Sequence, residues 1–116
     1  MSKFKGIAVY EILPNGCLSG VYSNNDPATG DEIFNEIAKK HPSEDSHGIV
    51  GKYTCGYIDL NNQLHECLLQ ITNISNTANN FRYEFVWRDK STNVIKWQGI
   101  GWRTRDNQIT VRYDDK

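Results

Sequence analysis

The chain has 116 residues, of which 38% are hydrophobic, 11% aromatic and 23% charged, and its formal net charge is −1 at pH 7. This composition predicts one globular domain over residues 1–116 rather than a disordered chain. It argues against a nucleic-acid binder, which would gather basic residues on one face. It also argues against a membrane protein, because no stretch reaches the roughly 20 apolar residues that cross a bilayer.

Two features of the sequence predict a cytoplasmic protein. The N-terminal apolar run is interrupted by polar residues and Pro14 and lacks a small-residue cleavage site, so we expect no signal peptide. Cys17, Cys55 and Cys67 are an odd number at no metal-ligand spacing, which favours reduced thiols. Cys55 and Cys67 would still oppose each other if the turn between their strands held three residues.

The first two predicted strands form a hairpin. Residues 7–13 are rich in β-formers and end in Pro14-Asn15-Gly16, where Asn-Gly predicts a two-residue type I′ turn. Residues 17–22 return from that turn. This register places on one face Val9, Glu11, Leu13, Leu18, Gly20 and Tyr22.

Residues 31–40 are the only segment predicted to be an α-helix. Ile33, Phe34, Ile37 and Ala38 form an apolar stripe at helical spacing. Acidic residues precede the stripe and lysines follow it, as the helix dipole favours, and Pro42 ends it.

Five further strands are predicted at residues 49–59, 63–72, 81–87, 94–104 and 109–113, joined by short polar turns. Together with the first hairpin they form an antiparallel meander of about seven strands. Such a sheet buries its apolar faces by curling on itself. We therefore predict a mainly β protein, a strongly curved or closed barrel covered by the helix at residues 31–40. The alternative is a flatter sheet wrapped around that helix.

The stretch WQGIGW at residues 97–102 carries two tryptophans around two glycines. Trp97 and Trp102 are five positions apart, so a regular strand points them to opposite faces. We favour a β-bulge at Gly99–Gly101 that brings both rings to the same interior, because glycine accepts a bulge with least strain. The alternative is a regular strand buried on both sides, with the barrel lumen on one side and the helix on the other.

The segments GKYTCGYIDLNNQLHECLLQI, FRYEFVW, WQGIGW and NQITVRYDD occur in this order. Their succession resembles small bacterial β-barrels of the calycin kind, which include lipocalin-like and avidin-like proteins. The resemblance covers residues 48–114 as a pattern of strand types. The early G-x-W of lipocalins is missing, and Gly20-Val21-Tyr22 stands in its place. The resemblance implies an apolar lumen and carries over no ligand or site residue.

One aromatic face is the best candidate for a binding site, because aromatic side chains with a few polar groups line many small-molecule sites. Phe81 belongs to this face by its position in the strand at residues 81–87. The narrow interior of a barrel of seven or eight strands favours the alternative that these rings are core packing. The candidate ligand-binding residues are Tyr53, Tyr57, Tyr83, Phe85, Trp87 and Trp97.

Other chemistry-bearing residues give weaker patterns. The loop of His41, Glu44, Asp45 and His47 matches no established metal spacing, so we predict no metal and no cofactor. A His65–Cys67 dyad is not expected either, on the view that the two side chains face opposite ways. Without an assembled nucleophile, base and orienting group, an enzyme is not our expectation.

Two hypotheses for function remain. The first is non-enzymatic binding of a small apolar or aromatic ligand within the barrel. The alternative is a protein-interaction or structural module, including a homodimer, with a fully packed core and no ligand. Neither nucleic acid nor membrane is an expected partner.

Overall fold

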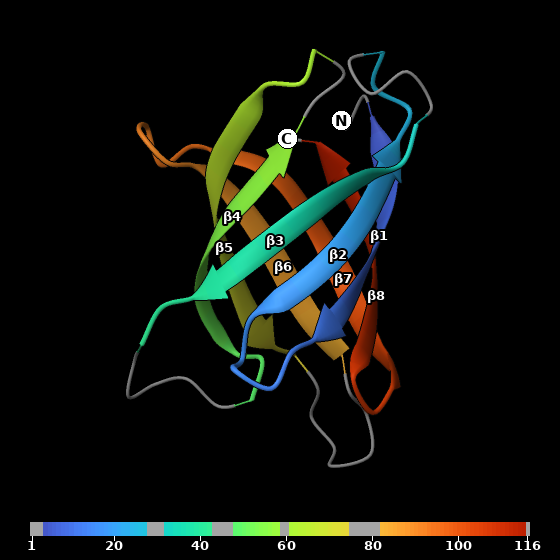
Figure 1. The fold of residues 1–116 in the computed structure, drawn as a ribbon, viewed down its shortest axis with the longest axis vertical. Helices are drawn as coiled ribbons and strands as arrows, with labels where there is room; N and C mark the ends of the chain where they lie inside the picture. Colours follow the sequence, from blue (N-terminus) through green and yellow to red (C-terminus); the bar gives the residue numbers. More distant parts are fainter. Residues whose placement is uncertain (1–3, 28–31, 43–47, 59–60, 75–81, 116) are drawn as a thin grey trace.

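The computed structural model describes residues 4–27, 32–42, 48–58, 61–74 and 82–115, which form one closed barrel. Each strand pairs antiparallel with the next, and β1 pairs with β8 to close the ring (Figure 1). The predicted antiparallel β-barrel is confirmed, whereas the predicted number of seven strands was wrong. The eight strands are β1 (Lys5–Ile12), β2 (Leu18–Asn24), β3 (Phe34–Lys40), β4 (Gly51–Ile58), β5 (Leu64–Asn73), β6 (Arg82–Asp89), β7 (Ile95–Arg105) and β8 (Gln108–Asp115).

The predicted helix at residues 31–40 was wrong, because Phe34–Lys40 is strand β3. An apolar stripe this short fits helical and strand periods alike. Pairing decides between them, since β3 closes the gap between β2 and β4. Glu36 and Ala38 point inward and Ile37 outward. Within the described residues, no helix is long and apolar enough to cross a membrane.

The first hairpin has a longer turn than the Asn15-Gly16 dipeptide predicted. Ile12 pairs with Leu18, so five residues rather than two connect the strands. A register change of one residue moves every side chain of a strand to the other face. Ala8, Tyr10 and Ile12 of β1 therefore share the inner face with Leu18 and Gly20. The predicted register had grouped Val9, Glu11 and Leu13 with those residues instead.

The WQGIGW stretch is a regular strand, and the bulge predicted at Gly99–Gly101 was wrong. Residues 97–102 pair in unbroken register with both neighbours, and the irregularities of β7 lie beyond this stretch. Trp97 faces inward opposite Trp87. Trp102 lies on the outer face of the barrel, and two guanidinium groups lie 5.7 and 5.8 Å from its ring centre. Those groups belong to Arg82 and Arg112.

The two glycines of this stretch lie where neighbouring residues approach β7 closely. A Cβ atom at Gly101 would lie 2.7 Å from the ring of Phe85. A Cβ atom at Gly99 would lie 2.8 Å from the Cβ atom of Tyr113. Close approach of the Phe85 ring at Gly101 and of β8 at Gly99, rather than a bend, explains the two glycines between the tryptophans.

The interior divides into two halves along the barrel axis. The half beside the β1–β2 and β7–β8 hairpins, here called the packed half, is filled with side chains that solvent does not reach. The other half lies beside both chain termini (Figure 1) and is called the hollow half. The packed half contains Leu18, Tyr53, Leu69, Ile71, Phe85, Ile109 and Val111.

Candidate functional site

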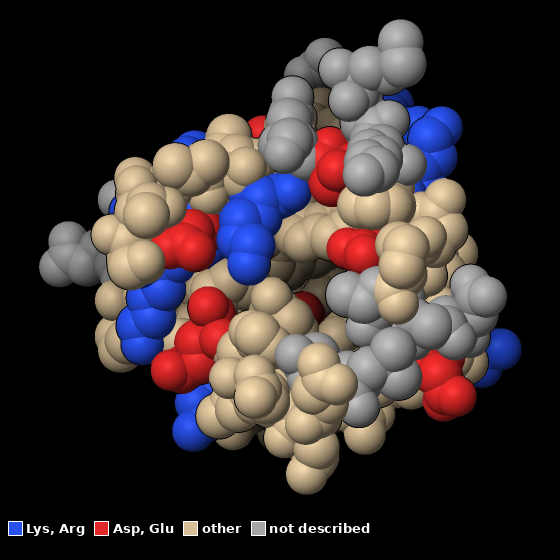
Figure 2. Space-filling view, turned by 90° about the horizontal axis from the view of Figure 1, so that it is seen from above, with Lys and Arg blue, Asp and Glu red and all other residues tan. Residues whose placement is uncertain are grey.

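The hollow half encloses a cavity of about 290 Å³. Figure 2 looks into this end of the molecule and shows the opening between acidic and basic side chains. Because every strand contributes to the wall, the site depends on the whole barrel. The lining residues are Ala8, Tyr10, Tyr22, Asn24, Asp26, Glu36, Tyr57, His65, Cys67, Trp87, Lys96, Trp97 and Tyr113.

The structure separates the six predicted ligand-binding residues into two groups. Tyr57, Trp87 and Trp97 line the cavity. Tyr53, Tyr83 and Phe85 are buried without lining it, and Phe81 lies outside the described residues. The predicted aromatic face is thus partly core and partly cavity wall.

Aromatic rings in contact with one another form much of the wall. Tyr57 stacks on the His65 ring at 5.3 Å between centroids and meets Tyr22 edge-on at 5.8 Å. Trp97 meets Tyr113 edge-on at 5.1 Å. Such contacts fix the rings against one another, so the cavity exists before any ligand binds.

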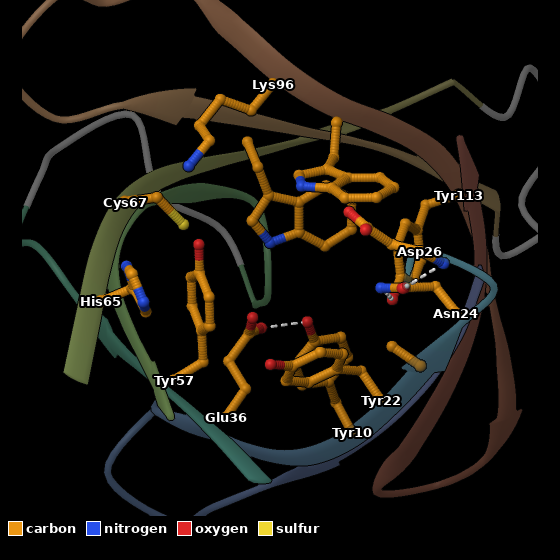
Figure 3. Close-up of a pocket in the computed structure, with 13 residues that line it drawn as sticks. Tyr10, Tyr22, Asn24, Asp26, Glu36, Tyr57, His65, Cys67, Lys96 and Tyr113 are labelled. Atoms are coloured by element: carbon orange, nitrogen blue, oxygen red, sulfur yellow. Dashed lines mark hydrogen bonds between the residues drawn. The ribbon is translucent and has the colours of Figure 1, made fainter. Parts of the chain in front are cut away.

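Glu36 supplies a carboxyl group from β3 to the middle of this aromatic wall (Figure 3). Only 6% of its surface is exposed, and the Tyr10 hydroxyl donates a hydrogen bond to its Oε2 atom. Burial raises the pKa of Glu36 to about 7, against hydrogen bonds from Tyr10, the Trp87 indole and the Cys55 thiol that lower it. The group therefore changes charge near neutral pH.

Gly20 positions the Tyr10 side chain. A Cβ atom at Gly20 would lie 2.4 Å from the Tyr10 ring, so only glycine lets the ring lie flat against β2. Burial, followed by the charge of Glu36, raises the pKa of Tyr10 well above its usual value. Tyr10 therefore remains a hydrogen-bond donor throughout the pH range in which Glu36 titrates.

Polar side chains surround the opening of the cavity. The Asn24 amide donates a hydrogen bond of 3.0 Å to the Tyr113 hydroxyl. The Asp26 backbone N–H donates to the Asn24 side-chain oxygen at 3.1 Å, which holds the segment after β2 against the wall. Lys96 enters from β7, on the opposite side of the cavity from Tyr10 and Tyr22 (Figure 3).

Two cysteines face each other on the inner wall. Cys55 and Cys67 are register partners on β4 and β5, and both are free and buried. The hydrogen bond with Cys67, followed by burial, raises the pKa of the Cys55 thiol. His65 and Cys67 both line the cavity, because residues two apart on a strand share a face. The expectation that these two side chains face opposite ways was therefore wrong.

The sequence did not identify the polar part of this site. The predicted hairpin register put Tyr10 on the face opposite Leu18 and Gly20, and Glu36 was placed on a helix. Among the described residues, no group of three His, Cys, Asp or Glu side chains is arranged to hold a metal ion. Of the predicted acidic and histidine loop, Glu44, Asp45 and His47 lie outside the described residues.

No protein-family model matches this chain, and no curated protein or solved structure is significantly similar to it. The similarity to lipocalin-like and avidin-like barrels stays a prediction from strand pattern. The closed eight-stranded barrel is an architecture that hosts many functions. The chemistry of the cavity must therefore carry the functional interpretation.

Proposed function

We propose that the protein binds a small molecule in the hollow half of its barrel. The observation that carries this proposal is a preformed cavity of about 290 Å³ beside a fully packed half. A barrel that served only as a structural module would have no reason to leave one half of its interior unfilled. Protein interiors are otherwise packed about as densely as organic crystals.

The wall of the cavity supports a small, partly aromatic ligand. Its volume lies at the lower end of the range of about 300–1,000 Å³ for small-molecule sites. A compound with one or two rings fits that space. Tyr22, Tyr57, Trp87 and Trp97 offer faces and edges for ring contacts, while a few polar groups set orientation. The buried free thiols favour a reducing compartment such as the cytoplasm.

Filling the cavity tests this proposal. Ala8 lines the wall, so Ala8→Leu places three additional carbon atoms in the binding space. The matched control is Val9→Leu, because Val9 is the next residue and faces outward. We expect compounds found by a ligand-observed NMR screen of small aromatic fragments to bind the wild type and Val9→Leu but not Ala8→Leu.

Native mass spectrometry of freshly purified protein provides a second measurement. A co-purified small molecule that leaves on denaturation would support the proposal and give the mass of the ligand. If all fragments bound Ala8→Leu as well as they bound the wild type, the cavity would not be their site.

Self-association is a second candidate function, and the exposed apolar side chains on the outer surface of β1–β3 favour it. Ile7, Val21 and Ile37 are 53%, 41% and 43% exposed on three neighbouring strands. Exposed apolar groups of this kind mark many interfaces. The native mass spectrum counts the subunits, and a dimer that Ile37→Lys disrupts would support this candidate.

A further inference from the structure

The buried carboxyl of Glu36 is surrounded by hydrogen-bond donors that carry no charge. The groups that lower its pKa are a phenol, an indole and a thiol, from Tyr10, Trp87 and Cys55. Within the described residues, no lysine, arginine or histidine forms an ion pair with it. All three neighbours donate hydrogen bonds to the Glu36 carboxyl group, which therefore acts as an acceptor. None of the three carries a positive charge that would balance the ionised carboxylate.

An unbalanced buried carboxylate is unfavourable in a folded protein. Glu36 differs from a core residue because its side chain borders the cavity (Figure 3). A ligand entering the hollow half can therefore reach the carboxyl group directly. A positively charged group on that ligand would replace the missing counter-charge.

The aromatic wall favours the same kind of ligand. The faces of tryptophan and tyrosine rings attract cations within about 6 Å of the ring centre, and this attraction is strongest where water is excluded. Tyr57, Trp87 and Trp97 line the cavity together with Glu36. A carboxyl group enclosed by aromatic rings is complementary to a protonated nitrogen bonded to carbon.

Resting on the proposed function, we propose that the ligand is a small organic cation whose protonated amine pairs with Glu36 while its carbon skeleton lies against the aromatic wall. Two charged groups near the opening, Lys96 and Asp26, lie farther along the same cavity and complement additional polar groups on the ligand. An anionic ligand would pair with Lys96 instead, and its binding is one outcome of the experiment.

Binding of a cation requires the ionised form of Glu36, so the affinity depends on pH. Affinity rises as pH increases toward the pKa of Glu36, about 7, by up to about tenfold per pH unit, and then becomes constant. Alkylamines stay protonated over this range. Besides the Cys55 thiol, which hydrogen-bonds Glu36, the titratable groups that face the same space from the surrounding elements are Tyr10, Tyr22, Asp26, Tyr57, His65, Cys67, Lys96 and Tyr113.

Three compounds of similar size and different charge provide the test: 2-phenylethylamine, 2-phenylethanol and phenylacetate. Isothermal titration calorimetry should show the amine binding to the wild type about tenfold or more tightly than the other two. Glu36→Gln keeps the shape of the side chain and should remove both this preference and the pH dependence. Glu11→Gln, on the outer face of the barrel, should change neither.

Each other result contradicts a specific part of the reasoning. Equal binding of the alcohol, or stronger binding of phenylacetate, would overturn the organic cation and leave small-molecule binding in place. A preference for the amine that survived in Glu36→Gln would move the anchor to another carboxylate, such as Asp26, and overturn the role of Glu36. A pH dependence that survived would assign it to another titratable group of the wall and would overturn that role as well. If none of the three compounds bound at millimolar concentration, the proposed function itself would lose support, and this inference with it.

Discussion

The packed and hollow halves of the barrel are built from the same eight strands with the same inward alternation, yet only one of them is filled. In the packed half, Leu69 and Ile71 of β5 lie beside Phe85 of β6 in the core, and Gly101 lets the Phe85 ring lie against β7. In the hollow half, the inward positions carry polar groups such as Asn24 and Glu36. The difference teaches that the choice of side chain, not the width of the barrel, decides which half is core and which is cavity.

The largest expected loss of folding stability comes from a substitution in the packed half. Phe85 is fully buried, stacks on the Tyr10 ring at 6.0 Å and meets the Trp87 ring at a tilt at 5.6 Å between centroids. Phe85→Ala should lower the free energy of unfolding by about 3–5 kcal/mol, because it leaves a cavity in the core. Urea denaturation measures this loss. Val86→Ala, on the outer face of β6, is the control and should cost less than half as much.

Glu36 should make the stability of the hollow half depend on pH. Its pKa is raised in the folded state, so the folded protein binds this proton more tightly than the unfolded chain does. The contribution of Glu36 to stability is therefore greatest below its unfolded pKa of about 4.5 and falls by about 3 kcal/mol as pH rises through about 7.

The contribution of Glu36 appears in the difference between the wild type and Glu36→Gln, measured by denaturation at each pH. Other carboxyl groups cancel in that difference. A difference that stayed constant between about pH 4.5 and pH 8 would contradict the raised pKa of Glu36.

A smaller loss of folding stability is expected for a substitution where the two halves meet. Gly99 lies between Phe85 and Tyr113 in the sheet, and a Cβ atom there would come within 2.2 Å of the Arg112 carbonyl oxygen. Gly99→Ala should therefore destabilise the protein by about 1–3 kcal/mol, measured as a lower midpoint in urea. Gly56→Ala is the matched control, since the nearest atom to its Cβ would be 3.7 Å away. A neutral Gly99→Ala would show that β7 can move away from β8.

The smallest expected effect on stability belongs to the cavity wall. Tyr57 is half-buried, whereas Tyr53 on the same strand is fully buried and donates a hydrogen bond of 2.7 Å to the Ile49 carbonyl. Tyr57→Ala should cost only about 1 kcal/mol of folding free energy, yet it should weaken ligand binding by calorimetry. Tyr53→Ala should cost at least about 3 kcal/mol. Equal losses would mean that the two halves contribute alike to stability.

The barrel was predictable because its signals are local. Alternating side chains in residues 81–87 and polar turns between the later strands specify consecutive hairpins, and such hairpins must curl to bury their apolar face. The short segment that became β3 was not predictable in this way. Its apolar stripe fits both periods, and only the pairing of β2 and β4 with it, which is a long-range property, selects the strand.

Only the apolar part of the cavity wall was predicted, because there too only the local alternation of side chains could be read from the sequence. Tyr57, Trp87 and Trp97 follow from alternation within their own strands. Glu36 interrupts the apolar residues on the inner face of β3, so this strand lacks the period-2 alternation that identified the later strands, and its remaining apolar residues fitted a helical stripe. Local rules of sequence fail where function places a polar group in the interior, so the failure of the helix prediction coincides with the candidate anchor.

The pairing of β1 with β8 has a consequence for how the protein is made. The Phe4 backbone N–H donates to the Asp115 side chain at 2.7 Å across 111 positions of sequence. Contacts between such distant positions form slowly, because a long loop must close first. During synthesis, β1 can pair with β8 only after the last strand has been made. All eight strands line the cavity, so the cavity is completed in this final step. A ligand held in it would therefore slow the opening of the β1–β8 seam and protect the finished chain from proteolysis.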